Sequence, residues 1–122
     1  MRFLAVAAGG ALGSMSRYAV ALLVATVWPR EFPLATLLIN VSGSFAVGFF
    51  ASFGAERVAI DPLLRLLVIT GFLGAYTTFS TLEYETWQLA HGRAFGLALL
   101  NIVASVAAGF VAVQLGVMLA RR

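Results

Sequence analysis

The stretch GFLGAYTTFST, residues 71–81, interrupts a strongly apolar segment with two glycines and then five hydroxyl-bearing side chains within six residues. Lipid cannot hydrogen-bond to the polypeptide backbone, so a polar interruption at membrane depth persists only where it is packed in protein or lines a wet cavity. Glycine weakens helical propensity, and Thr and Ser side chains compete for backbone hydrogen bonds. The stretch therefore predicts a transmembrane helix that is broken near its middle and a transport site at the break.

The composition around this stretch is that of an integral membrane protein. Hydrophobic residues make up 61% of the 122 residues and charged residues 11%, with a mean hydropathy of +0.98, well outside the range of a soluble domain. A span needs roughly 20 apolar residues, and the polar breaks between apolar segments are short. We therefore predict an all-α membrane protein with one four-helix transmembrane domain over residues 1–122, its helices at 3–27, 34–53, 63–89 and 95–120.

The charge and the rare residue types limit which functions this chain can have. The sequence has no cysteine and a single histidine, which argues against disulfides and against a zinc site. The net charge of +3 comes from eight arginines without lysine, and most of them lie at helix ends, where basic residues meet lipid headgroups. The pattern indicates anchoring in a lipid bilayer and no nucleic-acid binding.

Four spans place both termini on one side of the membrane, and the arginines are unevenly divided between the two sides. This bias favours cytoplasmic termini by the positive-inside rule, yet it is modest enough that insertion in both orientations stays open. The side of the termini has Arg2, Arg57, Arg65, Arg121 and Arg122, and the opposite side has Arg30 and Arg93.

The first predicted helix carries small residues that favour close helix contacts. Ala5, Gly9 and Gly13 recur every four residues on one face, as in small-xxx-small association motifs, and this spacing fits an oligomer interface and packing within the chain equally well. An oligomer is expected because one small bundle leaves too little packed surface around a pore.

Arg17 continues the same spacing. Since a charge at the bilayer centre costs about 2.5–3.5 kcal/mol, we expect Arg17 to snorkel, to pair with a carboxylate or to border an aqueous vestibule.

Polar side chains form a stripe on the second predicted helix, where Thr36, Asn40, Ser44 and Gly48 share one face at i, i+4 spacing. Burying an amide without hydrogen-bond partners costs several kcal/mol of folding free energy, so the Asn40 side chain must have such partners. Either it makes an interhelical hydrogen bond or it contributes to an ion site.

The fourth predicted helix repeats the pattern with Asn101, Ser105 and Gly109. Neutral amide and hydroxyl groups can solvate a small ion without trapping it as a fixed charge would. The two stripes together favour an ion pathway, and hydrogen bonding between helices is the alternative reading.

The predicted break itself offers ligands for ions of either sign. Freed carbonyls at the end of the first half-helix could coordinate a cation, whereas Phe79, among the hydroxyls, has a ring whose positive edge can favour an anion. Glu83 and Glu85 follow on different helix faces. Carboxylates are unexpected beside an anion path but suit cation or proton coupling.

Three stretches carry a resemblance to one family. GGALGSMSRY at 9–18, TLLINVSGSFAVGF at 36–49 and TGFLGAYTTFST at 70–81 resemble, in order and spacing, the signature stretches of the Fluc (CrcB) fluoride channels. The resemblance implies an antiparallel, dual-topology homodimer in the bacterial inner membrane. It also implies two pores that pass cytoplasmic fluoride passively down its electrochemical gradient and give fluoride resistance. Such a protein is a channel and not an enzyme.

The resemblance further assigns individual residues. It implies a structural Na⁺ at the dimer centre, held by the backbone carbonyls of Gly74 and Thr77, and it places Glu85 near the pore. Leu82 stands where the family usually has a second pore phenylalanine, so the aromatic pair is incomplete unless another ring such as Tyr84 compensates. The remaining pore positions are Asn40, Thr78, Phe79, Ser80, Thr81, Asn101 and Ser105, with Asn101 at a position where serine is often found.

Two alternatives from other classes fit the length and composition. A small multidrug-resistance type transporter, coupled to protons, also has four short helices in an antiparallel dimer. Its mechanism needs a carboxylate deep in the first helix, and residues 3–27 contain no Asp or Glu. A non-transporting assembly subunit is the other alternative, and the two polar stripes argue against it.

Overall fold

The computed structural model describes residues 1–56 and 60–122, so Arg57 of the charge comparison lies outside the described residues. Within them, four helical stretches are long and apolar enough to cross a membrane, which confirms the predicted all-helical membrane class. The predicted ends lie within three residues of the observed ones. Three of the spans are the continuous helices α1 (Arg2–Val27), α2 (Leu34–Glu56) and α6 (Phe95–Arg121).

The third span, Pro62–His91, is assembled from several segments. It begins with α3 (Pro62–Arg65), capped by the Asp61 carboxylate, and widens into the π-helical segment η1 (Leu66–Leu73) before the short α4 (Gly74–Tyr76). Thr77 and Thr78 then adopt extended backbone angles, with ψ of 159° and 119°. The next helix, α5 (Phe79–His91), is capped by Thr78, whose hydroxyl oxygen accepts from the Thr81 N–H.

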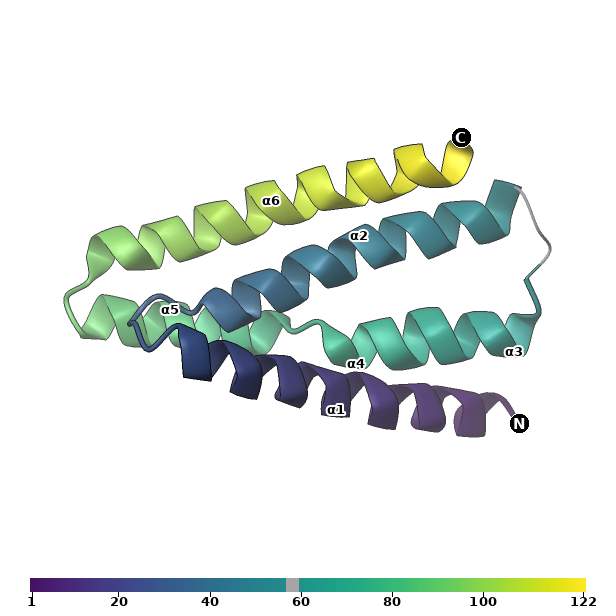
Figure 1. Cartoon of the computed structure of the whole chain (residues 1–122), viewed down its shortest axis with the longest axis horizontal. Coiled ribbons are helices and arrows are strands. Elements are labelled where there is room, and N and C mark those ends of the chain that lie inside the picture. Colours follow the sequence, from purple (N-terminus) through teal and green to yellow (C-terminus); the bar gives the residue numbers. More distant parts are fainter. Residues whose placement is uncertain (57–59) are drawn as a thin grey trace.

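The spans pack as two pairs, α1 against η1 and α4, and α2 along α6, while α5 also packs against α6 (Figure 1). Both pairs depend on glycine at the contact. A Cβ at Gly9 would collide with the Leu67 carbonyl oxygen, and one at Gly13 with that of Phe72. Gly48 and Gly116 allow the same close approach of α2 and α6. The small-residue motif of the first helix therefore serves packing within the chain.

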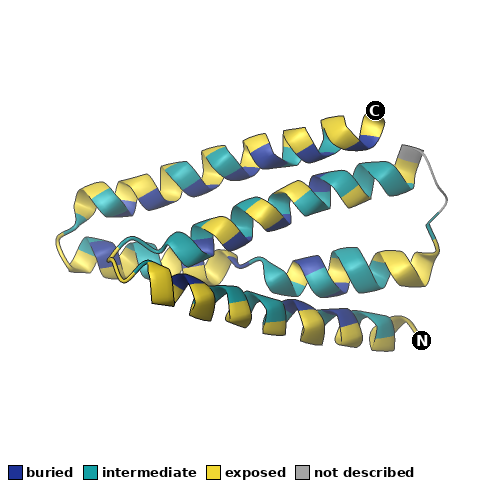
Figure 2. Cartoon of the chain, in the orientation of Figure 1, coloured by how far each residue is buried: buried dark blue, intermediate teal, exposed yellow. Residues whose placement is uncertain are grey.

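The outer faces of the helices are largely exposed and apolar, as the yellow surfaces of α1 and α6 in Figure 2 show. Buried residues of α6 recur every three or four positions and include the polar Asn101 and Ser105 beside small residues. The stripe predicted on the fourth helix thus faces the inside of the bundle, where its polar groups need partners.

We expect Gly9→Ala to lower stability by about 1–3 kcal/mol, because the added methyl group forces α1 away from the η1 backbone. Gly10→Ala is the matched control, since nothing lies within 4 Å of a Cβ at Gly10. Thermal unfolding of the purified variants in detergent measures the difference. Equal melting temperatures for the two variants would contradict the packing described for Gly9.

Candidate functional site

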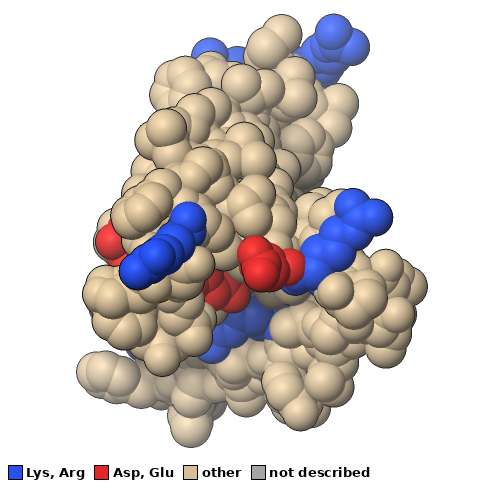
Figure 3. All heavy atoms as spheres, turned by 90° about the vertical axis from the view of Figure 1, so that its left-hand side faces the viewer, with Lys and Arg blue, Asp and Glu red and all other residues tan. Residues whose placement is uncertain are grey.

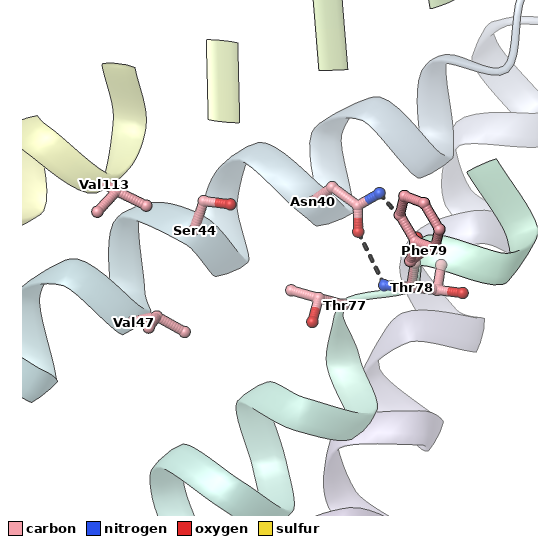
Figure 4. A pocket seen from close by; sticks show the side chains of 7 residues that line it. All are labelled: Asn40, Ser44, Val47, Thr77, Thr78, Phe79 and Val113. Atoms are coloured by element: carbon pink, nitrogen blue, oxygen red, sulfur yellow. Dashed lines mark hydrogen bonds between the residues drawn. The ribbon is translucent and has the colours of Figure 1, made fainter. Parts of the chain in front are cut away.

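The helical hydrogen bonding of the third span is interrupted at Thr78. The Asn40 side chain on α2 supplies hydrogen bonds to the backbone there. The Asn40 amide nitrogen donates to the Thr78 carbonyl oxygen at 2.9 Å, and the Thr78 N–H donates to the Asn40 side-chain oxygen at 2.8 Å (Figure 4). In a continuous α-helix this N–H would donate to the Gly74 carbonyl, four residues back. The amide therefore holds the extended segment in place, and the Gly74 carbonyl at the start of α4 does not receive the Thr78 N–H.

An open pocket of about 280 Å³ lies beside the Asn40–Thr78 hydrogen bonds. It is lined by Asn40, Ser44, Val47, Thr77, Thr78, Phe79 and Val113. Figure 4 shows the Phe79 ring next to the Asn40 amide. A primary amide has two N–H donors, and only one of them is directed to Thr78, so the second is available to the pocket. An amide donor beside an aromatic ring, in a pocket whose other lining residues are valines and hydroxyl residues, suits a small anion better than a cation.

Glu85 lies further along α5. It accepts a hydrogen bond from Thr36, the first polar residue of α2. The Thr36 hydroxyl donates to one Glu85 carboxylate oxygen at 2.8 Å, and the other oxygen is buried and has no partner among the described residues. A pocket of about 320 Å³ brings Glu85 together with Arg17, Ser14 and Thr81. Arg17 thus lines the same pocket as the Glu85 carboxylate.

Asn101 and Ser105 lie apart from these pockets. Asn101 is 0% exposed, and its amide nitrogen donates to the Thr86 hydroxyl oxygen at 2.9 Å. The Ser105 hydroxyl is buried and has no partner in the described part of the chain. One turn further along α6, a Cβ at Gly109 would lie 3.5 Å from the Ser44 hydroxyl oxygen, so the two polar stripes face each other.

The remaining predicted pore residues do not gather at one point. Leu82 is buried, whereas Ser80 and Thr81 are exposed on α5. The Thr78 hydroxyl donates to that of Thr81 at 2.9 Å. The Tyr84 ring is exposed and stacks on another ring of α5, so it does not occupy the place of Leu82.

Sequence reasoning missed two contributions to the site. Thr86 was not singled out, although it lies between Leu82 and Leu89 on the buried face of α5, and a hydroxyl in the middle of an apolar face is the signal that identifies it. Thr36 was read as one member of a stripe, but its partner could not be known because the two bonded residues are 49 positions apart.

The end of the molecule that carries the α1–α2 and α5–α6 connections is charged. Figure 3 looks onto this end and shows basic and acidic side chains close together. The Arg30 guanidinium lies 4.5 Å from the centre of the Trp28 ring. Arg–Trp pairs of this kind are typical of the boundary between lipid and water. A second pocket, of about 430 Å³, lies at this end and is lined by Glu85 together with Glu31 and Gly92 of the two connections.

Comparison with known proteins agrees with the site. Residues 4–117 match the family described as CrcB-like protein, Camphor Resistance (CrcB). This chain belongs to the CrcB family. It is 46% identical to fluoride-specific ion channel FluC 1 of Moorella thermoacetica over 99% of this chain and 86% of the relative. It is also 40% identical to fluoride-specific ion channel FluC of Solibacter usitatus over the full length of both.

A third relative, fluoride-specific ion channel FluC of Roseiflexus sp., is 39% identical over 99% of this chain and 98% of its own length. The four apolar spans and these bacterial CrcB relatives identify the chain as a multi-pass protein of the bacterial inner membrane. The multidrug-transporter alternative gains no support from these relatives.

We expect Asn40→Ala to destabilise the protein by roughly 1–3 kcal/mol, because it leaves the buried Thr78 N–H and carbonyl without partners. Thermal unfolding in detergent measures the loss. Thr26→Ala on α1 is the control, since the exposed Thr26 hydroxyl donates only to the Leu23 carbonyl of its own helix. A variant of Asn40 as stable as that of Thr26 would show that the interruption holds its shape without the amide.

Proposed function

We propose that this chain forms a fluoride-selective channel that lets cytoplasmic fluoride leave the cell passively and so gives fluoride resistance. The observation that carries the proposal is the meeting of the Asn40 amide and the Phe79 ring at an open pocket beside the extended Thr77–Thr78 segment. The names of the CrcB relatives, which are fluoride-specific ion channels, give independent support.

The proposed mechanism uses neutral groups that replace the water around the ion. An amide N–H of Asn40 and the Ser44 hydroxyl, which also lines the pocket, donate hydrogen bonds to fluoride, and the positive edge of the Phe79 ring adds a weak attraction. None of these groups is a fixed positive charge that would hold the ion. Because HF enters cells and dissociates there, a negative membrane potential alone drives fluoride outward through a selective path.

We propose that two copies assemble as an antiparallel, dual-topology homodimer with two pores. Phe79 is 74% exposed although it lies within a membrane span, and the pocket beside it is open on one side in the single chain. A second copy would close that side. The modest arginine bias allows both orientations of insertion, which an antiparallel pair requires.

We further propose that a structural Na⁺ lies at the dimer centre, held by the backbone carbonyls of Gly74 and Thr77. The local backbone fits such a role, because the Thr78 N–H donates to Asn40 and leaves the Gly74 carbonyl without its usual helical partner. Gly74 is exposed, so its carbonyl is accessible to a second chain. Oxygen ligands suit a hard cation, and two copies would supply equivalent pairs around a two-fold axis.

In the proposed pore Leu82 keeps the apolar bulk of the usual second phenylalanine but has no positive ring edge. It is 6% exposed, in contrast to Phe79, so it forms part of the bundle interior of the single chain. One ring from each chain is then the aromatic contribution to each pore. Arg17, in the pocket shared with Glu85, is proposed to border the aqueous vestibule that leads toward this site.

The proposal predicts rapid release of fluoride from proteoliposomes that contain the purified protein. Efflux is read with a fluoride electrode after a potassium ionophore is added, so that charge movement is not limiting, and chloride-loaded vesicles are the control. Fluoride release without chloride release is the expected result. An absence of fluoride release, or release only with a proton gradient, would reject a passive fluoride channel.

We expect Phe79→Ile to slow this efflux by about tenfold or more while a folded dimer persists, because isoleucine keeps apolar bulk but has no ring edge. Phe110→Ile is the matched control, since Phe110 is also an exposed phenylalanine of a membrane span but lies away from the pocket. Size-exclusion chromatography checks assembly. Unaltered efflux through the Phe79 variant would remove this ring from the pore.

A further inference from the structure

Thr77, the first residue of the extended segment, fits into a gap on α2 that exists because residue 43 is glycine. Gly43 is buried, and a Cβ built on it would collide with the Cγ2 methyl group of Thr77. The next nearest atoms, two carbons of the Tyr76 ring, would lie 3.3 and 3.6 Å from that Cβ, close to ordinary contact distance. Of these atoms, only the Thr77 methyl group requires glycine at position 43. We call this gap the Gly43 notch.

The Thr77 hydroxyl group determines which branch of the side chain enters the notch. It donates to the Leu73 carbonyl oxygen at 3.0 Å, and the Thr77 backbone N–H donates to the same oxygen at 3.1 Å. The two heavy atoms on a threonine Cβ occupy staggered positions, so a hydroxyl directed to Leu73 leaves one direction for the methyl group. That direction is the Gly43 notch.

The same turn of α2 also contacts the residues on either side of Thr77. The Tyr76 hydroxyl oxygen lies 3.0 Å from that of Ser42, and the Asn40 amide makes its two hydrogen bonds to Thr78. Three consecutive residues of the third span thus meet residues 40–43 of α2. The hydrogen bonds of Asn40 fix the peptide group after Thr77, and the Gly43 notch fixes the Thr77 side chain.

The position of Thr77 sets where two groups of the proposed channel lie. The Thr77–Thr78 peptide bond is trans, so the Thr77 carbonyl points away from the Asn40 oxygen that accepts the Thr78 N–H. This carbonyl is one of those proposed to hold sodium. Phe79, two residues later, begins α5 beside the pocket. A Thr77 side chain displaced from the notch would shift both groups.

We propose that Gly43 is a positioning residue of the channel, because its bare backbone seats the Thr77 methyl group and so sets the extended segment that presents Phe79 and the Thr77 carbonyl. The effect on ion flow rests on the proposed fluoride channel, whereas the contact itself concerns only packing between α2 and the third span. Gly43 in this role touches no ion. A glycine that served only a general close approach of helices would not depend on the Thr77 methyl group.

The first test exchanges the methyl group between the two sides of the contact. Gly43→Ala adds a methyl group that collides with Thr77, so we expect the melting temperature in detergent to fall by about 3–8 °C. Thr77→Ser empties the notch but keeps the hydroxyl that donates to Leu73. In the Thr77→Ser background, Gly43→Ala should therefore leave the melting temperature unchanged or raise it. An equal fall in both backgrounds would overturn the proposal.

Gly48→Ala is the matched control on the same helix. Its Cβ would collide with the backbone carbonyl oxygen of Val113 on α6, and no substitution at Thr77 relieves that collision. We expect Gly48→Ala to lower the melting temperature equally with and without Thr77→Ser. Rescue of Gly48→Ala by Thr77→Ser would show that the Thr77→Ser variant stabilises the bundle in general, and it would overturn the specific contact with Gly43.

The second test measures fluoride efflux from proteoliposomes for the same variants. Gly43→Ala should slow efflux by about tenfold or more, and adding Thr77→Ser should restore the rate to within about twofold of that of Thr77→Ser alone. Unchanged efflux through Gly43→Ala, or slow efflux that Thr77→Ser does not rescue, would overturn the positioning role. If Gly43→Ala alone fails to fold, a folded double variant supports the proposal and an unfolded one contradicts it.

The two readouts distinguish failure of the inference from failure of the proposed function. Rescue of the Gly43→Ala melting temperature by Thr77→Ser, without any fluoride efflux from the unaltered protein, would keep the notch and reject the channel. Fluoride efflux from the unaltered protein, together with equal losses of melting temperature in both backgrounds, would keep the channel and reject the notch.

Discussion

Inside a bilayer, every departure from helical geometry must be repaired by another hydrogen-bonding group, and the paired bonds between Asn40 and Thr78 make that repair here. The rest of the site depends on it. The extended Thr77–Thr78 segment turns Phe79 toward the Asn40 amide, starts α5 with a Thr78 cap and leaves the Gly74 carbonyl of α4 without the Thr78 N–H as its helical donor. One side chain from α2 thus sets the geometry of the whole third span.

Close packing elsewhere makes this arrangement rigid. Glycines bring α1 against the η1 backbone and α2 against α6, so the elements that flank the interruption cannot slide easily. Tyr76 adds a contact immediately before the extended segment, because its hydroxyl lies 3.0 Å from that of Ser42 on α2. Small residues in membrane helices promote such close approach since lipid gives no hydrophobic drive for association.

Two further pairs of polar groups join α5 to its neighbours α2 and α6. The Thr36 hydroxyl donates to Glu85, which lines two pockets, whereas Thr86 accepts from the fully buried amide of Asn101. Glu85 and Thr86, at adjacent positions of α5, therefore have different surroundings.

Composition and local pattern determined much of this protein. Apolar segment length defined the four spans, the residues 71–81 indicated the polar interruption, and i, i+4 spacing gave the stripes on α2 and α6, because each of these depends on neighbours in the chain. Only the tertiary structure decided the partners. Asn40 and Thr78 are 38 residues apart, Thr36 and Glu85 are 49 apart, and Thr86 and Asn101 are 15 apart. Whether such residues meet depends on the rotation of each helix about its axis, which packing across the bundle sets.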